Sequence, residues 1–440
     1  MVWLQKFPVY LIYSAMKSKN KDFSAAMKGV HVSLLAMFIF ISSFLFQAAH
    51  ANEAVQGISK RIYRYINDAQ KLIDEKQYRQ ALPRLEKARD LKLTAYEQAV
   101  VLNMIGYVHY QNEDLQKALQ SYAELLKVPR LPDSMARNTY LTISQLNLVA
   151  GDYVKAEESA RLLLKSPGRK PPPPSSSVIL AQSLMGQERF EEALEPLLFA
   201  ISEQKKAGAN VRENWLATLS SIYFNLEKFE EMRDVLYELI SINPKKQYLI
   251  NLAAIHGQLG EKDKQLALIE ALNDDNRLST QSQLLTLANL FMVQQLPFKA
   301  AALLEREISN NRVEKNERNL QFQSQAWYLA GEYRKAVPPL EEAARMSGDG
   351  ELWLRIARLE VALYEWERAE VAAKAAIEKG GLKNPGSALI LEGMALAYQG
   401  KFYKAKRVLR QAVKLRESEK WAKQWLAFVD NEQKRLGNAR

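Results

Sequence analysis

One short phrase recurs along the chain at a nearly constant interval. It consists of Gly or another small residue, a polar residue, an aromatic residue, two further residues and Ala, and it is clearest at Gly151–Ala156, Gly331–Ala336 and Gly400–Ala405. With its weaker copies included, the last position of the phrase falls at residues 81, 118, 156, 193, 232, 265, 301, 336, 369 and 405, in steps of 33 to 39 residues. Such a period is typical of a solenoid, in which each unit buries its apolar face by stacking on its neighbours.

Each repeat is predicted to form two antiparallel helices, A and B, joined by a tight turn. In the second repeat, Val100, Met104, Tyr107 and Val108 recur at helical spacing within the predicted helix A. Small side chains twelve positions before the end of the phrase would let the two helices cross at close range. Such residues are Gly106, Ser144, Ala181, Ser220, Ala253, Ser324, Ala357 and Gly393.

These features resemble the tetratricopeptide repeat (TPR) over about residues 58–416. The resemblance implies an all-α, right-handed solenoid of about ten helix-turn-helix repeats, with a C-terminal capping helix and a groove lined by helix A. The sixth and seventh repeats are degenerate. The expected layout is a targeting segment (1–51), an array of three repeats (52–165), a Pro-rich linker (166–177), an array of about seven repeats (178–416), and a capping helix with a basic tail (417–440).

The targeting segment has three recognisable parts. Lysines precede an apolar run from Val30 to Phe46, and Ala49-His50-Ala51 follows it. A basic region, an apolar run and an A-x-A site are typical of a secretory signal peptide, so we expect cleavage after Ala51 and a location in the periplasm of a Gram-negative cell. The run of 17 residues is also close to the length of a spanning helix, which leaves an inner-membrane anchor facing the periplasm as the alternative. The start at Met1 or Met16 stays open.

Catalytic signals are scarce. The chain has no cysteine, which excludes disulfides and thiolate metal sites. Beyond the targeting segment, its histidines are His109 and His256, which fall in separate repeats. Paired carboxylates such as Glu191-Glu192 open helix B, where the helix dipole favours them. Because repeats, linker and cap occupy the chain, we predict no enzymatic activity, no cofactor and no metal.

Partner binding is instead expected on the helix A face of the repeats. The helix A positions that match the groove of TPR proteins carry amide, aromatic and arginine side chains, a mixture suited to an extended peptide or polar segment of a protein. These candidates are Asn103, Tyr107, Gln145, Gln182, Arg318, Gln321, Gln325, Tyr328, Arg355 and Arg358.

A basic patch at the C-terminal end is the second candidate. Residues 401–440 carry twelve Lys/Arg and four Asp/Glu, a net charge of +8, whereas the whole chain has +11. Such a patch is expected to attract an anionic membrane surface or an acidic protein, with nucleic acid excluded by the predicted location. The alternative is a solvated face that keeps the last repeat soluble. The patch consists of Lys404, Lys406, Arg407, Arg410, Lys414, Lys420 and Lys423.

The whole-chain layout is similar to that of the TPR proteins encoded beside TonB–ExbB–ExbD energy-transduction systems. This resemblance implies a non-catalytic periplasmic adaptor that supports TonB-dependent uptake by contacting the transducer or its motor. Two alternatives remain from the sequence: a TPR scaffold for envelope assembly or polysaccharide export, and an enzyme regulator or carrier that binds peptidoglycan or lipid.

Overall fold

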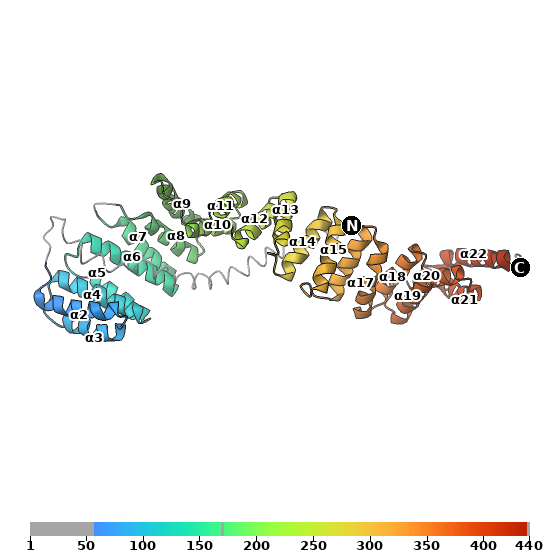
Figure 1. Ribbon diagram of the computed structural model, residues 1–440, viewed down its shortest axis with the longest axis horizontal. Coiled ribbons are helices and arrows are strands. Elements are labelled where there is room, and N and C mark those ends of the chain that lie inside the picture. Colours follow the sequence, from blue (N-terminus) through green and yellow to red (C-terminus); the bar gives the residue numbers. More distant parts are fainter. Residues whose placement is uncertain (1–56, 169–170, 438–440) are drawn as a thin grey trace. The chain divides into compact units, whose positions relative to one another are not determined.

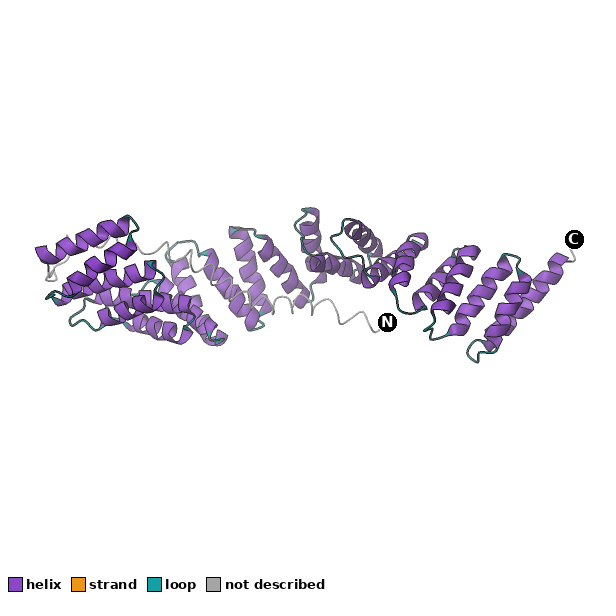
Figure 2. Cartoon of the chain, turned by 90° about the horizontal axis from the view of Figure 1, so that it is seen from below, coloured by secondary structure: helices purple, strands orange, loops and turns teal. Residues whose placement is uncertain are grey.

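The computed structural model describes residues 57–168 and 171–437, and every regular element within these ranges is an α-helix (Figures 1 and 2). The targeting segment expected over 1–51 lies outside the described residues. In the described ranges, no helix is both long and apolar enough to cross a bilayer. The all-α helical-repeat architecture predicted from the sequence is confirmed.

The chain divides into two compact units, Met1–Leu259 and Gly260–Arg440. In the first unit, consecutive helices pack side by side as helix A and helix B of successive repeats. Its described helices are α2 (Lys60–Asp74), α3 (Tyr78–Arg89), α4 (Ala95–Gln111), α5 (Leu115–Leu126), α6 (Asp133–Ala150), α7 (Tyr153–Lys165), α8 (Pro174–Gly186), α9 (Phe190–Lys206), α10 (Glu213–Asn225), α11 (Phe229–Ile242) and α12 (Lys246–Gln258).

The second unit continues the same plan and ends on an unpaired helix. Its described helices are α13 (Lys262–Asp274), α14 (Gln281–Val293), α15 (Pro297–Ser309), α16 (Glu317–Leu329), α17 (Tyr333–Met346), α18 (Glu351–Ala362), α19 (Trp366–Lys379), α20 (Pro385–Tyr398), α21 (Phe402–Val413) and α22 (Glu419–Gly437). The pairs from α14–α15 to α20–α21 are therefore the seventh to the tenth repeats.

The helices begin and end where local chemistry dictates. Thr94 caps α4, because its hydroxyl accepts a hydrogen bond from the backbone N–H of Glu97 and the Glu97 carboxylate accepts one from the N–H of Thr94. The same carboxylate accepts the N–H of Ser59 at 2.8 Å and so joins the start of α2 to the start of α4. At the other end of a helix, Gly151 terminates α6 with φ of 76°, a conformation that costs other residues a steric penalty.

Small residues occur where helices A and B cross, as the sequence predicts. The helix B alanines of the phrase are fully buried. At Gly106 of α4, an added Cβ would lie 2.8 Å from the Tyr122 ring of α5, and at Gly393 of α20 it would lie 2.5 Å from Leu409 of α21. Helix A therefore approaches helix B too closely for a larger side chain at these two positions.

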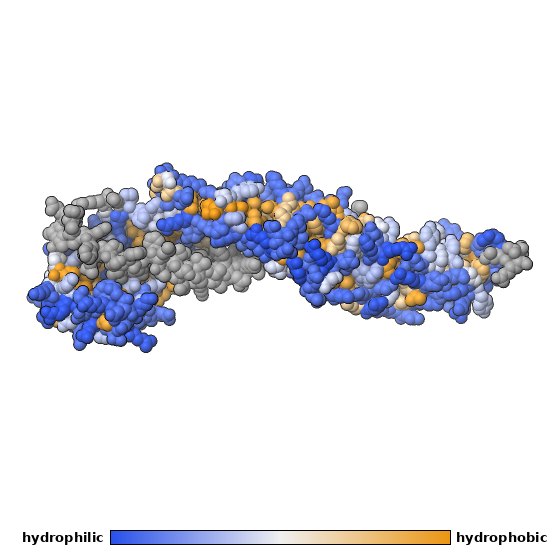
Figure 3. Space-filling view, in the orientation of Figure 1, coloured by the Kyte–Doolittle hydropathy of each residue, from blue (hydrophilic) through white to orange (hydrophobic). Residues whose placement is uncertain are grey.

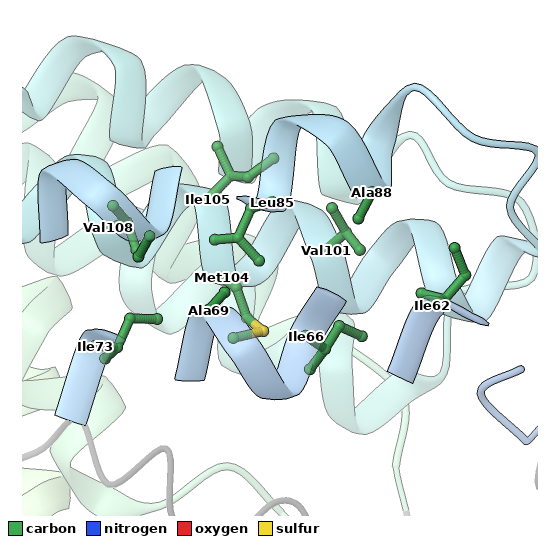
Figure 4. Packing of buried hydrophobic residues seen from close by; sticks show 11 residues of the cluster. Ile62, Ile66, Ala69, Ile73, Leu85, Ala88, Val101, Met104, Ile105 and Val108 are labelled. Carbon is green, nitrogen blue, oxygen red and sulfur yellow. The ribbon is translucent and has the colours of Figure 1, made fainter. Parts of the chain in front are cut away.

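The core runs between neighbouring repeats as well as within them. In the first unit, Ile66 and Ala69 of α2 pack with Leu85 of α3 and with Met104 and Ile105 of α4, so one cluster joins three helices (Figure 4). Burying an aliphatic side chain of this size stabilises the fold by about 1.5–3 kcal/mol. Each repeat thus depends on the next one for part of its apolar burial.

The Pro-rich segment is shorter than the linker expected over 166–177. Helix α8 begins at Pro174, and Ser176 and Ser177 of this helix are buried. A proline at the start of a helix loses no helical hydrogen bond, which is why the run of prolines ends in a helix. Because α7 and α8 pack against each other, the array continues across this segment. The boundary between the compact units instead follows Leu259, inside the region expected to form one C-terminal array.

The capping helix predicted for the C-terminal end is present as α22. It packs on α21 and α20 through Ala422, Leu426 and Val429. The side chains of Lys420 and Gln424 point away from this contact and are exposed. The helix therefore covers the apolar side of the last repeat, while Trp421 on its own surface stays exposed.

Candidate functional site

The helix A face of the eighth and ninth repeats brings together the six candidates of the second unit. On α16, the four candidates recur at helical spacing and share one face. They are Arg318, Gln321, Gln325 and Tyr328. On α18, Arg358 occupies the position that Gln325 occupies on α16, eleven residues before the helix B alanines Ala369 and Ala336. Equivalent positions in stacked repeats lie on one continuous face.

A side-chain hydrogen bond connects the two helices of this face. The guanidinium of Arg355 on α18 donates to the amide oxygen of Gln325 on α16 at 3.0 Å. Burial lowers the pKa of Arg355, and the neighbouring positive charge of Arg358 lowers it further, while Tyr328 acts in the opposite direction. A partly buried arginine beside a second arginine is an unfavourable arrangement unless an anion is supplied.

No described carboxylate supplies that anion. Arg318, Arg355 and Arg358 form no salt bridge within the part of the chain that the structure describes. Arginines on the helix B side of the same repeats are paired: Arg334 lies 2.8 Å from Glu365, and Arg368 lies 3.0 Å from Glu360. Among the arginines of these two repeats, the uncompensated charge is therefore specific to the helix A face. A guanidinium pair of this kind fits a carboxylate of a bound partner.

Exposed aromatic rings stand on both sides of the arginine pair along the repeats. Tyr328 of α16 lies 5.3 Å from Tyr333, measured between ring centroids, and a little under half of each residue is exposed. Beyond α18, Trp366 stacks on Tyr398 at 4.2 Å with an interplanar angle of 10°, and Tyr398 also contacts Phe428 of α22 at 6.0 Å. Aromatic rings of this kind provide contact area at low entropic cost.

Sequence reasoning missed most of these rings. Tyr333 and Trp366 occupy the aromatic position of the recurring phrase, so they read as a packing signature of the repeat. Tyr398 ends helix α20, where nothing in the sequence separates a stacked ring from a solvated one. The available signal was an aromatic residue near the end of helix A, which occurs at Tyr328 in the eighth repeat and at Tyr398 in the tenth.

The four candidates of the first unit are dispersed over three helices. Asn103 and Tyr107 lie on α4, Gln145 lies on α6 and Gln182 lies on α8, all partly buried. Within the described residues, no hydrogen bond joins any two of them. Tyr107 packs against the cluster of α2, α3 and α4, and burial raises the pKa of its hydroxyl. The candidates of the first unit are therefore separate, uncharged polar side chains, whereas those of the second unit include two neighbouring arginines.

The basic patch divides into paired and unpaired members. Lys406 forms an ion pair with Asp430 of α22, and Lys423 lies 2.6 Å from Glu419 within α22. The other members are exposed and form no salt bridge with any described residue. They are Lys404, Arg407, Arg410, Lys414 and Lys420.

His109 and His256 are both buried among the packed helices. His256 is buried and its Nε2 lies 3.1 Å from the hydroxyl of Tyr237 on the preceding helix. His109 is also buried, and burial lowers its pKa. Over the described ranges, no three His, Asp, Glu or Cys side chains are grouped closely enough to hold a metal ion.

Comparison with known proteins gives two matches along the chain to the family model described as Tetratricopeptide repeat, at residues 216–246 and 386–419. The chain carries tetratricopeptide repeats. The matched segments cover α10–α11 and α20–α21, two of the helix pairs described above. A search of curated proteins found no significant match.

Solved structures with similar helical repeats include three examples. A tetratricopeptide repeat protein from Parabacteroides merdae is 19% identical, with a TM-score of 0.35, over 59% of this chain and 99% of that one. The Naa15/Naa10 complex bound to HypK-THB is 16% identical, with a TM-score of 0.39, over 83% of this chain and 60% of the other. YrrB, a TPR protein with an unusual peptide-binding site, is 18% identical, with a TM-score of 0.32, over 42% and 95%.

Proposed function

We propose that this protein is a non-catalytic interaction scaffold that binds an extended, acidic segment of a partner protein on the helix A face of α16 and α18. The observation that carries the proposal is the pair Arg355–Arg358: Arg355 is partly buried, Arg358 is exposed, and neither has a carboxylate partner among the described residues. Tetratricopeptide repeats suggest a role in protein interaction, and the charge of this face suggests the chemistry of the partner.

The bound segment would combine carboxylates with apolar side chains. A carboxylate that reaches Arg355 and Arg358 relieves their mutual repulsion and forms charge-assisted hydrogen bonds. Rings such as Tyr328 and Tyr398 would pack against the flanking side chains of the segment. The cations should also accelerate the encounter with an acidic partner, an effect that salt weakens.

The cellular setting is a further part of the proposal. We propose export to the periplasm and an adaptor role in a TonB-dependent uptake system; support comes from the signal-like pattern of residues 1–51 and from the whole-chain layout. A scaffold for envelope assembly or polysaccharide export would have the same construction. TonB and ExbB genes found beside the gene for this protein would support the uptake role, whereas glycosyltransferase or polymerase genes found there would support the export role.

In-cell photocrosslinking tests the binding face. A crosslinking amino acid placed at Gln325, Tyr328 or Arg358 is expected to capture one common partner, identified by mass spectrometry. Glu378, which is exposed on helix B of the ninth repeat, serves as the control position and should not capture it. Capture should weaken when Arg355 and Arg358 are both changed to Ala in the Gln325 variant. Recovery of no protein from any of the three sites would refute the proposed face.

A further inference from the structure

Helix α21 differs from the other B helices of its unit in the sign and pairing of its charges. Residues Phe402–Val413 contain no Asp or Glu. The apolar side of the helix is buried through Ala405, Val408, Leu409 and Ala412. The opposite side carries Lys404, Arg407 and Arg410, and the next residue after the helix, Lys414, extends the same row.

Most cations of the preceding B helices in this unit lie beside an acid. On α17, Arg334 pairs with Glu365 at 2.8 Å, and on α19, Arg368 pairs with Glu360 at 3.0 Å. On α21, only Lys406 has such a partner, Asp430 of α22. A face that served solubility alone would intersperse charges of both signs, as the earlier B helices do. The outward row of α21 instead presents one sign of charge.

An exposed aromatic ring begins this row at its N-terminal end. Tyr403 is 82% exposed, the largest exposed fraction among the large hydrophobic side chains of the described residues. On a helix wheel, Tyr403, Arg407, Arg410 and Lys414 fall on one side, because they are separated by four, three and four residues. A tyrosine among lysines and arginines is the composition that favours the headgroup region of a membrane.

We propose that the outward row of α21 (Tyr403, Lys404, Arg407, Arg410 and Lys414) binds the surface of a membrane that contains anionic lipids. The row lies along one ridge of a packed helix, which suits a broad anionic surface. Because the apolar side of α21 is used in the core, the helix binds by charge and by Tyr403 and does not insert. Each Lys or Arg close to an anionic surface strengthens binding about fivefold. The row shares no residue with the helix A face of α16 and α18, so either proposal can be refuted without refuting the other.

The chain lacks cysteine, so a single introduced cysteine reports locally on this surface. Gln411 is exposed on α21 beside the cationic row, and Gln411→Cys in the full chain would carry an environment-sensitive dye. Vesicles of phosphatidylcholine and phosphatidylglycerol at 3:1 are expected to shift the dye emission to the blue at 50 mM NaCl. Pure phosphatidylcholine vesicles, or 500 mM NaCl, should abolish the shift because the attraction is electrostatic. The control is the same dye at Lys87→Cys on α3. Its emission should stay unchanged, because this part of the chain is not expected to touch the vesicle.

Charge reversal distinguishes this row from a general effect of net charge. The triple variant Arg407→Glu, Arg410→Glu, Lys414→Glu should bind the anionic vesicles at least about a hundredfold more weakly, as three contributions are lost. The matched triple variant Arg84→Glu, Lys87→Glu, Arg89→Glu, on exposed positions of α3, changes the net charge equally and should retain binding. The proposal is overturned if the Gln411 dye does not respond to anionic vesicles. It is equally overturned if the two triple variants lose the response to the same extent, or if the α21 variant keeps it.

Discussion

Gln399, which follows helix α20, donates a hydrogen bond from its side-chain amide to the carboxylate of Glu370 in the preceding repeat, at 3.1 Å. The same nitrogen reaches the backbone carbonyl of Trp366 at 3.2 Å. Lys401 donates to the same carboxylate oxygen at 3.0 Å, and Lys374 pairs with the other oxygen. One carboxylate thus joins the ninth repeat to the tenth.

The same arrangement recurs between the third and fourth repeats. Gln187, which follows α8, donates to Glu157 of α7 at 2.8 Å and to the backbone carbonyl of Tyr153 at 3.3 Å. Arg189 takes the place of Lys401 and lies 2.7 Å from Glu157. The same set of polar contacts therefore joins two pairs of neighbouring repeats, in addition to apolar stacking. The pKa values of both carboxylates, Glu157 and Glu370, are lowered.

Replacing Glu370 by Gln should destabilise the fold in a pH-dependent manner. Burial raises the pKa of Glu370, but hydrogen bonds from Lys374, Lys401 and Gln399 lower it more, to about 2 from a usual value of 4.5. Because the folded pKa is the lower one, the ion pairs stabilise the protein above about pH 4.5 and lose this effect as the pH falls towards 2. We expect a loss on the order of 2 kcal/mol at pH 7, after allowance for the half-exposed lysines.

Thermal unfolding followed by circular dichroism at pH 7 and pH 2 checks this expectation. The melting temperature of Glu370→Gln should be clearly below that of the unchanged protein at pH 7 and close to it at pH 2, where the folded-state carboxylate is itself about half protonated. Glu378→Gln, on an exposed position of the same helix, is the control and should have little effect at either pH. An equal loss at both pH values would show that packing, and not charge, is responsible.

Replacing Gly106 by Ala tests the close crossing of α4 and α5. The added methyl group would lie 2.8 Å from the Tyr122 ring, so the ring or the helix must move. Overpacking of this kind costs about 1–3 kcal/mol, which exceeds the gain that Ala normally gives a helix. The second change Tyr122→Leu removes the ring, so its cost should be smaller in the Gly106→Ala background than in the unchanged protein. Additive losses in urea unfolding would contradict a direct clash.

Residue types at fixed spacing were sufficient to predict the repeat fold. Helices A and B of one repeat cross so closely that only a small residue fits at positions such as Ala118 and Gly106. The same residue types therefore recur at the same spacing in the sequence. The extent of the Pro-rich linker was wrong because prolines are compatible both with a spacer and with the first turn of a helix, and Pro174 starts α8. The position of the unit boundary after Leu259 was likewise not predicted.

The candidate site could be predicted only in part. The helix A spacing placed Gln321 and Gln325 on one face of α16, because that depends on the register of a single helix. The hydrogen bond from Arg355 to Gln325 and the stack of Trp366 on Tyr398 depend on which side chains meet across two repeats. Those contacts are set by how successive helix pairs stack, and the spacing within one repeat does not contain that information. Both groove and basic-patch residues stay predictions as binding sites.

Reversing the charge of Arg358 should weaken peptide binding without unfolding the protein. Arg358 is exposed and makes no described salt bridge, and a carboxylate in its place would relieve the repulsion on Arg355, so Arg358→Glu is expected not to lower the melting temperature. A fluorescent extended peptide that alternates Glu with Leu should bind the unchanged protein and bind the variant at least tenfold more weakly in fluorescence anisotropy. Arg334→Gln, which removes a positive charge from the helix B side, is the control and should keep the affinity. Equal affinities for all three proteins would contradict an acidic ligand at this face.

Glu360 provides the opposite electrostatic case to Glu370. Its side chain is fully buried on α18, and neither carboxylate oxygen accepts a hydrogen bond from the described residues. Arg368 lies 3.0 Å away, but the pKa of Glu360 is raised because burial outweighs the attraction of this arginine. In the folded state the ionised form is therefore held at a cost.

Replacing Glu360 by Gln should stabilise the protein at neutral pH. Because the folded pKa lies above the unfolded value, the cost of ionising Glu360 is absent at low pH and grows as the pH rises through the folded pKa. We expect Glu360→Gln to raise the melting temperature at pH 8 by an amount that corresponds to about 1 kcal/mol, and to have little effect at pH 4. Arg368→Ala alone should lower stability at pH 8 by on the order of 2 kcal/mol, since it leaves the buried carboxylate without compensation, whereas the same change in the Glu360→Gln background should cost much less. If Glu360→Gln destabilises the protein at pH 8, the ion pair with Arg368 outweighs burial and the expected sign is wrong.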